Sequence, residues 1–136
     1  MKEYITWSEQ YSVNFKAIDE QHKQVFKLLN DIFILTRSGK QASRKALEQL
    51  GFRLRLFTET HFVYEERVLE MLQYPRLNNH KTYHRRMENR THAITQDLVD
   101  NVKDPQDLLL FLKDWWQKHI QGNDKDYVPL VEKLEL

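Results

Sequence analysis

The sequence predicts an all-α fold: an antiparallel up-down-up-down four-helix bundle with an irregular N-terminal arm and a short C-terminal helix. Apolar residues recur in steps of three and four along four long segments, which is the period of one helix face. The 136 residues contain only three glycines and three prolines, too few for the turn every ~8–12 residues that a β-sandwich or barrel needs. Gly39, Pro75 and Pro105 fall between the apolar segments. Short connections of this kind make consecutive helices antiparallel neighbours.

The first helix is expected to start near Ile18 and to end around Arg37, because Ser38-Gly39 supplies a C-terminal glycine. The second is expected to begin after Ser43, an N-cap residue, and to end at Tyr74-Pro75, where proline disfavours a helical conformation of the residue before it. The inward face of this second helix is predicted to carry Leu47, Leu50, Leu54, Phe57, His61, Glu65, Val68 and Leu72.

The third helix is expected to fade near Val102. Asp104-Pro105 has the form of an N-cap followed by a proline in the first helical position, and so opens the fourth helix. Gly122 is expected to end it. Because domains cluster at about 100–150 residues, we expect one domain over residues 1–136. It would comprise an arm over 1–17 that packs by its aromatic residues, a bundle over about 18–121 and a C-terminal segment over 122–136.

Composition excludes several classes of function. The 21 Lys and Arg residues balance 20 Asp and Glu residues, so no basic excess favours nucleic acid or anionic lipid. Cysteine does not occur, which excludes zinc fingers, thiolate nucleophiles and cysteine-held iron–sulfur clusters. No stretch approaches the ~18 apolar residues of a membrane span, and the N-terminus lacks the apolar run of a signal peptide. We therefore expect a cytoplasmic protein, a monomer or weak oligomer, that binds neither nucleic acid nor membrane.

Metal-binding side chains interrupt the apolar helix faces. The second and third helices each carry a pair of such residues four apart, which share a face with Cβ atoms about 5–6 Å from each other. The first helix carries one histidine, and the fourth ends in a histidine and an aspartate. In this topology the starts of helices one and three and the ends of two and four meet, at levels that agree to within roughly 10 Å. Seven side chains should therefore converge: His22, His61, Glu65, His80, His84, His119 and Asp124.

Imidazole and carboxylate without thiolate suit iron, copper, zinc or manganese. Seven ligands exceed the four that one zinc ion usually takes, so two ions bridged by carboxylates fit better. The Glu-x-x-His step of four-carboxylate di-iron bundles does not occur, nor do a His-Glu-x-x-His motif, a Gly-x-Ser-x-Gly motif or a phosphate-binding glycine loop. A single histidine is more often a packed or solvated residue than a ligand, but the joint pattern on four helices favours ligation. Glu66 and Glu88 are expected at the surface or behind the ligands.

The sequence resembles the hemerythrins, specifically the single-domain bacteriohemerythrins, over nearly the whole chain. The resemblance depends on these segments: Trp7 with Val13, Ile18-Asp19-Glu20-Gln21-His22-Lys23, His61-Phe62-x-x-Glu65-Glu66, Tyr74-Pro75, His80-x-x-x-His84 and His119-Ile120-x-x-x-Asp124-x-x-Tyr127. It implies a non-haem di-iron centre with a solvent-derived oxo or hydroxo bridge. One iron would be held by His80, His84 and His119, the other by His22 and His61, with Glu65 and Asp124 bridging both.

The resemblance also implies the function. The iron with two imidazoles keeps one open position, where O2 would bind reversibly for storage, delivery or sequestration, without catalysis. The alternative is a di-iron enzyme or sensor handling peroxide, nitric oxide or oxygen. An apolar pocket one turn deeper would exclude water and leave room for a diatomic molecule. Its candidate residues are Val25, Phe26, Phe57, Met87, Trp115 and Trp116, although the two tryptophans are more simply explained as core.

Overall fold

The computed structural model describes residues 3–37 and 44–134 and contains no strand within them. The four predicted long helices are present: α1 (Lys16–Thr36), α2 (Arg44–Met71), α3 (Leu77–Asp100) and α4 (Pro105–Lys118). Shorter elements occur before and after them: a 3₁₀ turn η1 (Glu9–Tyr11), a π-helical turn η2 (His119–Asp124), a 3₁₀ turn η3 (Lys125–Tyr127) and α5 (Val128–Glu132). The all-α class and the short C-terminal helix are confirmed.

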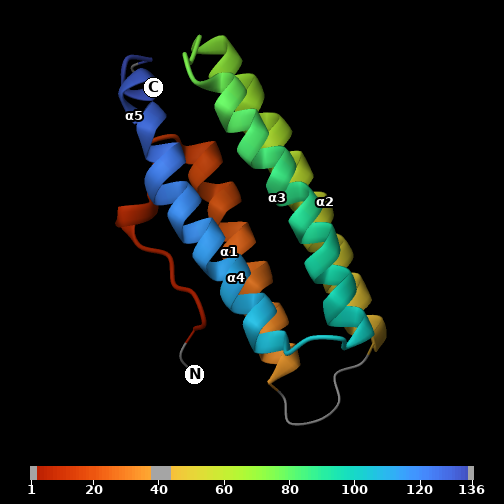
Figure 1. Cartoon of the computed structure of the whole chain (residues 1–136). Coiled ribbons are helices and arrows are strands. Elements are labelled where there is room, and N and C mark those ends of the chain that lie inside the picture. Colours follow the sequence, from red (N-terminus) through yellow and green to blue (C-terminus); the bar gives the residue numbers. More distant parts are fainter. Residues whose placement is uncertain (1–2, 38–43, 135–136) are drawn as a thin grey trace.

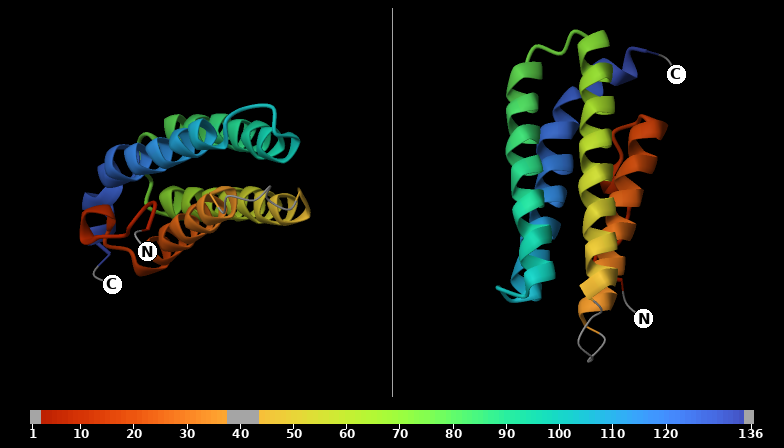
Figure 2. Two further views of the ribbon diagram at one scale, coloured as in Figure 1. Left: turned by 90° about the horizontal axis from the view of Figure 1, so that it is seen from below. Right: turned by 90° about the vertical axis from the view of Figure 1, so that its right-hand side faces the viewer.

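The four long helices form a closed ring of neighbours. α1 packs against α2 and α4, and α3 packs against the same two helices. Figure 1 shows the last turn of α1, the first turn of α2 and the α3–α4 connection at its lower end, and the α2–α3 connection and α5 at its upper end. In the two further views α1 again lies beside α2, and α3 beside α4 (Figure 2). Each helix therefore runs antiparallel to both neighbours, which is the predicted up-down-up-down topology.

The N-terminal arm is irregular apart from η1 and is held by its aromatic residues, as predicted. Tyr4 stacks on Phe33 of α1, with ring centroids 4.2 Å apart. Trp7 lies with its ring centroid 5.8 Å from that of Phe26. Phe15 packs beside a second apolar cluster nearer the C-terminal segment. These contacts attach the arm along α1. In Figure 1 the arm runs upward beside the bundle and joins α1 at the upper end.

The predicted boundaries of α1, α2 and α3 agree with the structure to within two or three residues. α1 begins at Lys16, two residues before Ile18. α2 and α3 end close to residues with left-handed backbone, Gln73 (φ 56°) and Asn101 (φ 55°). A left-handed residue stops the helical hydrogen-bond ladder, and so both helices end slightly earlier than expected. Three residues predicted to shape helix ends lie outside the described residues: Ser38, Gly39 and Ser43.

α4 begins as its sequence predicts. The Asp104 carboxylate accepts a hydrogen bond of 2.9 Å from the backbone N–H of Gln106, and Pro105 occupies the first helical turn. The side chain thus satisfies one of the N–H groups that a helix start leaves without an intrahelical partner.

Asp104→Ala is expected to destabilise the protein by about 1 kcal/mol, because the cap is lost without any change in the core. Asp104→Asn is the control, since asparagine caps equally well. Urea unfolding of the three proteins tests this, and equal midpoints for the alanine variant and the wild type would contradict it.

The end of α4 corrects one prediction. Gly122 does not end the helix: α4 stops at Lys118, and the chain continues through Gly122 in the π-helical turn η2. The glycine is not left-handed, so it cannot form the usual αL cap. The bundle therefore extends past residue 121, and His119 and Asp124 lie at the two ends of one wide turn.

A glycine within α2 allows two helices to approach closely. Gly51 costs helix stability about 1 kcal/mol relative to alanine, and a Cβ atom there would lie 3.2 Å from Thr95 Cβ on α3. That distance is tighter than ordinary van der Waals contact, so a side chain at this position would require Thr95 to shift by a few tenths of an ångström.

A buried polar layer separates two apolar clusters. The larger cluster includes Val25 and Phe62. The smaller one includes Ile18 and Leu69, which lie near the first turn of α1 and the last turn of α2. On α1, His22 lies between Ile18 and Val25 and is fully buried. Within the described residues no helix is long and apolar enough to cross a membrane.

Candidate metal centre

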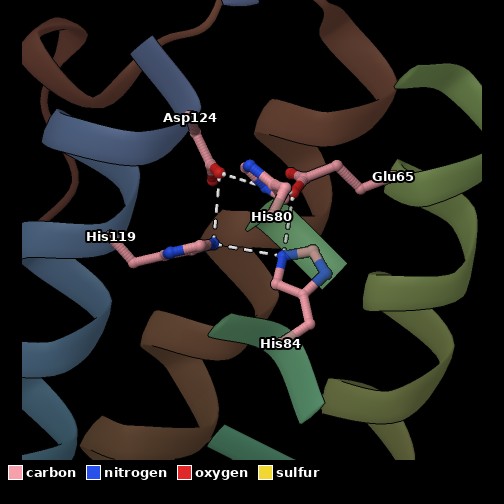
Figure 3. Close-up of side chains that lie close together, drawn as sticks. All are labelled: Glu65, His80, His84, His119 and Asp124. Atoms are coloured by element: carbon pink, nitrogen blue, oxygen red, sulfur yellow. Dashed lines mark hydrogen bonds and ion pairs between the residues drawn. The ribbon is translucent and has the colours of Figure 1, made fainter. Parts of the chain in front are cut away.

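The structure brings the seven predicted metal-binding side chains together in this polar layer. None exposes more than 3 % of its surface. They come from α1, α2, α3 and from η2, the turn that directly continues α4. Figure 3 shows five of them pointing toward one another, with the two from η2 facing the three from α2 and α3: Glu65, His80, His84, His119 and Asp124.

The donor atoms form two groups that share one residue. The first group contains three imidazoles and two carboxylates, and the second contains two imidazoles and Glu65; within each group one donor atom per residue lies within 4.8 Å of the others. The first group consists of Glu65, His80, His84, His119 and Asp124, and the second of His22, His61 and Glu65. Two cation positions joined by a shared carboxylate follow from this arrangement.

Both carboxylates are divided between the two groups. Glu65 Oε1 lies 2.6 Å from His80 Nε2 and 3.2 Å from His84 Nε2. Its other oxygen, Oε2, lies 3.8 Å from His22 Nε2 and 3.6 Å from His61 Nε2. A carboxylate whose two oxygens face different sets of imidazoles can bind two ions at once.

Asp124 repeats this division from the opposite side. Its Oδ1 lies 3.1 Å from His80 Nε2 and 3.2 Å from His119 Nε2. Its Oδ2 lies 3.3 Å from His22 Nε2. The two carboxylates therefore face each other across the same pair of positions.

Hydrogen bonds outside the layer fix three of the five rings. His61 Nδ1 donates to Gln21 Oε1 at 2.6 Å, and His119 Nδ1 donates to Asn123 Oδ1 at 3.1 Å. His84 Nδ1 donates to Glu66 Oε2 at 2.7 Å. A carboxylate can only accept, so His84 Nδ1 must carry a hydrogen. With Nδ1 bonded outward, the Nε2 atom of each ring faces the centre, where it can hold a proton or a metal ion.

Without a metal ion, protons neutralise part of this layer. Burial lowers the pKa of His61 to about 3 and that of His119 to about 4, so both rings are neutral near pH 7. Burial also opposes charge on His80, but the close Asp124 carboxylate and the hydrogen bond with Glu65 outweigh it and raise the pKa of His80 to about 10. Burial likewise disfavours ionised Glu65, yet hydrogen bonds from His80 and His84 hold its pKa well below the usual range. The centre thus contains carboxylates that require positive charge between them.

Several buried polar atoms in the layer have no hydrogen-bond partner. These are both ring nitrogens of His22, Nε2 of His61 and both carboxylate oxygens of Asp124. A buried polar atom without a partner costs about 1–3 kcal/mol, and more when it is charged. Since all except His22 Nδ1 appear in the close contacts above, coordination to cations would satisfy them. The residues present therefore fit a metal centre with nitrogen and oxygen ligands.

The π-helical turn explains why the last two predicted ligands are five residues apart. In a π-helix hydrogen bonds join residues i and i+5, so His119 and Asp124 lie one wide turn apart and both face inward. Such turns occur mostly as local widenings of α-helices and frequently at functional sites. The pairs on α2 and α3 reach the same result with four-residue steps.

Phe62 lies against the centre, although the sequence analysis named it only within a motif and assigned it no role. Its ring is fully buried and stacks on His84, with centroids 3.8 Å apart and planes 5° from parallel. It also lies 5.6 Å from Trp116, centroid to centroid. The three- and four-residue period places Leu54, Phe57, His61 and Glu65 on one narrow stripe of the helix. The buried face of α2 is wider than this stripe and also includes Phe62 and Glu66.

Tyr127 also contacts the centre. Its hydroxyl donates a hydrogen bond of 3.1 Å to Glu65 Oε2. Burial and the negative charge of Glu65 raise the pKa of Tyr127 well above its usual value, so the hydroxyl keeps its proton. The signal for this residue was its place three residues after Asp124 in the motif, but no feature of the motif indicates that its hydroxyl contacts Glu65.

The candidate pocket residues occupy different surroundings. Four are buried in the larger apolar cluster, while Phe57 and Trp115 are half-buried. Trp116 lies 6.0 Å from His61 and 6.4 Å from His22, centroid to centroid, and Trp115 stacks on His119 at 4.3 Å. Phe57 lines a groove on the outer surface between α1 and α2. The four buried residues are Val25, Phe26, Met87 and Trp116.

Comparisons with known proteins agree with this geometry. The family model described as "Hemerythrin HHE cation binding domain" matches residues 13–131. The chain is 29 % identical over 123 residues to a myohemerythrin from Theromyzon tessulatum, covering 89 % of this chain and 88 % of that protein. It is 25 % identical over 130 residues to a bacteriohemerythrin from Stenotrophomonas maltophilia (strain R551-3), covering 94 % and 82 % respectively.

The fold is shared with solved structures as well. The crystal structure of a wild-type hemerythrin superposes with a TM-score of 0.81 at 23 % identity, covering 93 % of this chain and 97 % of that one. The family match extends over most of the chain and includes all seven buried donor residues. The chain therefore belongs to the hemerythrin family of HHE cation-binding domains.

Proposed function

We propose that this protein binds dioxygen reversibly at a non-haem di-iron centre and acts as an oxygen-binding protein, not as an enzyme. The first ion would be held by His80, His84 and His119, and the second by His22 and His61. Glu65 and Asp124 would bridge the two ions together with an oxo or hydroxo group. The observation that carries this proposal is the division of each carboxylate between two sets of imidazoles.

The unequal number of imidazoles supports a binding position on one side only. Three rings face the first position and two face the second. An ion at the second position would therefore keep an open place for a small ligand. When bound, a ferrous pair supplies the electrons that O2 takes up on binding and returns on release. Five neutral imidazoles donate less negative charge than a site of four carboxylates, which favours binding over oxidation of a substrate.

The surrounding residues would protect this chemistry from water. Phe62 and Trp116 are fully buried beside the rings of His84 and His61. Met87, one turn beyond His84 on α3, is also buried. Apolar side chains at these places exclude water and anions, whose entry would promote oxidation of the ions. The hydrogen bonds from Nδ1 atoms hold the rings in a fixed orientation, so binding a diatomic ligand needs no rearrangement of them.

The experiment is to load the purified protein anaerobically with ferrous iron and to cycle it between oxygenated and oxygen-free buffer. We expect two iron ions per chain, charge-transfer bands of an oxo-bridged ferric pair in the oxidised protein, and stoichiometric, recoverable O2 uptake over repeated cycles. Catalytic consumption of peroxide or nitric oxide would instead support the enzyme alternative. One ion per chain under iron-replete conditions would contradict the di-iron proposal.

A further inference from the structure

The outward hydrogen bonds of the rings are not equivalent. His61 and His119 donate to neutral amide oxygens, those of Gln21 and Asn123. His84 alone among these three rings donates to a carboxylate, that of Glu66. A carboxylate acceptor draws the Nδ1 proton away and makes Nε2 a stronger electron donor to a metal ion. The strength with which His84 donates electrons to a metal ion therefore depends on the charge of Glu66.

Glu66 is in turn paired with a residue that reaches solvent. It is 8 % exposed, and the same oxygen that accepts from His84 also accepts a short hydrogen bond from Arg85 Nη2. The Arg85 side chain is 49 % exposed and also lies 3.3 Å from Glu88 Oε1. A continuous chain of polar contacts thus leads from the centre to the surface, through His84, Glu66 and Arg85.

The guanidinium and the imidazole compete for one carboxylate oxygen. Positive charge on Arg85 stabilises the ionised carboxylate and lowers its tendency to attract the Nδ1 proton of His84. When an imidazole donates electrons to a metal ion more weakly, the oxidised state of that ion is less stabilised. Arg85 thus opposes the effect that Glu66 has on the ring of His84.

We propose that Arg85 is a positioning residue that sets, through Glu66, the electron-donating strength of His84 and hence the reduction potential of the ion held there. This inference rests on the proposed di-iron function. An exposed arginine would thus influence, through Glu66 and His84, how readily the buried centre oxidises.

The test uses three substitutions and a matched control in the iron-loaded protein. Arg85→Gln removes the charge, Arg85→Lys keeps it, and Glu66→Gln removes the carboxylate. Arg86→Gln removes an equal charge from the next residue of α3, which is exposed and makes no contact with Glu66 among the described residues. Midpoint potentials are measured by spectroelectrochemistry, and the release of iron to an excess of chelator is followed for each loaded protein.

Opposite signs are expected for the two partners. Arg85→Gln should shift the potential negative and retain iron at least as long as the wild type. Glu66→Gln should shift it positive and release iron about 10–100-fold faster, the usual effect of losing a partner behind a ligand. Arg85→Lys should lie near the wild type, and Arg86→Gln should match it.

An ion pair that only supports the fold would give a different pattern. Both Arg85→Gln and Glu66→Gln would then loosen the ring and speed iron release together. That result, or equal potentials for Arg85→Gln and Arg86→Gln, overturns the proposal. If the wild type takes up no iron, the di-iron function fails by itself. In that case the rate of zinc release from the zinc-loaded proteins decides the role of Arg85. The variants should rank in the same order as predicted for iron release.

Discussion

Glu65→Ala should remove both metal ions at once. One oxygen of Glu65 faces His80 and His84, and the other faces His22 and His61. Among residues 3–37 and 44–134 no other single carboxylate contacts as many of the rings. The variant should bind less than one iron per chain where the wild type binds two. It should also lose the stabilisation that a bound ligand gives, about 3–4 kcal/mol when the free metal is at 100–1,000 times its Kd.

The measurement is metal analysis together with urea unfolding, with and without iron. Iron should raise the unfolding midpoint of the wild type and leave that of Glu65→Ala unchanged. Glu70→Ala is the matched control, because Glu70 is an exposed glutamate on the same helix. A Glu65→Ala protein that still holds two ions would show that the carboxylate is not shared between them.

Phe62→Ala should have the second large effect, on both stability and oxidation. Removing a fully buried phenylalanine ring costs about 3–5 kcal/mol through lost apolar contact and the cavity that remains. The cavity would open beside His84 and next to Trp116, where water could reach the centre. We therefore expect the oxygenated protein to oxidise irreversibly several times faster than the wild type.

Phe52→Ala provides the control on the same helix. Phe52 is 56 % exposed, so its loss should change stability by no more than about 0.5 kcal/mol and leave oxidation unchanged. Phe62→Leu should lie between the wild type and Phe62→Ala, since leucine fills part of the space. Identical oxidation rates for all four proteins would exclude Phe62 from the protection of the centre.

The fold was predictable because local signals and the apolar pattern agree. Each helix carries a clear three- and four-residue period, and Asp104-Pro105 fixes the start of α4 to the residue. The same period placed seven donor residues at one end of the bundle, where the structure indeed has them. Steps of four on α2 and α3 required no knowledge of tertiary structure, because they follow from helix geometry alone.

Other features depend on tertiary contacts that a single sequence does not encode locally. Gly122 has the usual form of a helix stop, but the backbone continues through it because the turn widens to bring Asp124 inward. Phe62 has no polar atom to attract attention, and its role comes only from lying face to face with His84. Arg85 resembles any exposed helix arginine until Glu66 is found beneath it.

The wide turn at the end of α4 contains one residue more than a regular α-helical turn would need to keep two side chains on one face. That additional residue fixes the rotational phase of everything after it, including η3 and α5. If residues 119–124 formed a regular α-helix instead, Asp124 would be rotated by about 100° away from the face that it now shares with His119. Tyr127 would be rotated by the same angle, and its hydroxyl would no longer face Glu65. The expanded turn thus acts as a spacer that aligns the C-terminal segment with the centre it covers.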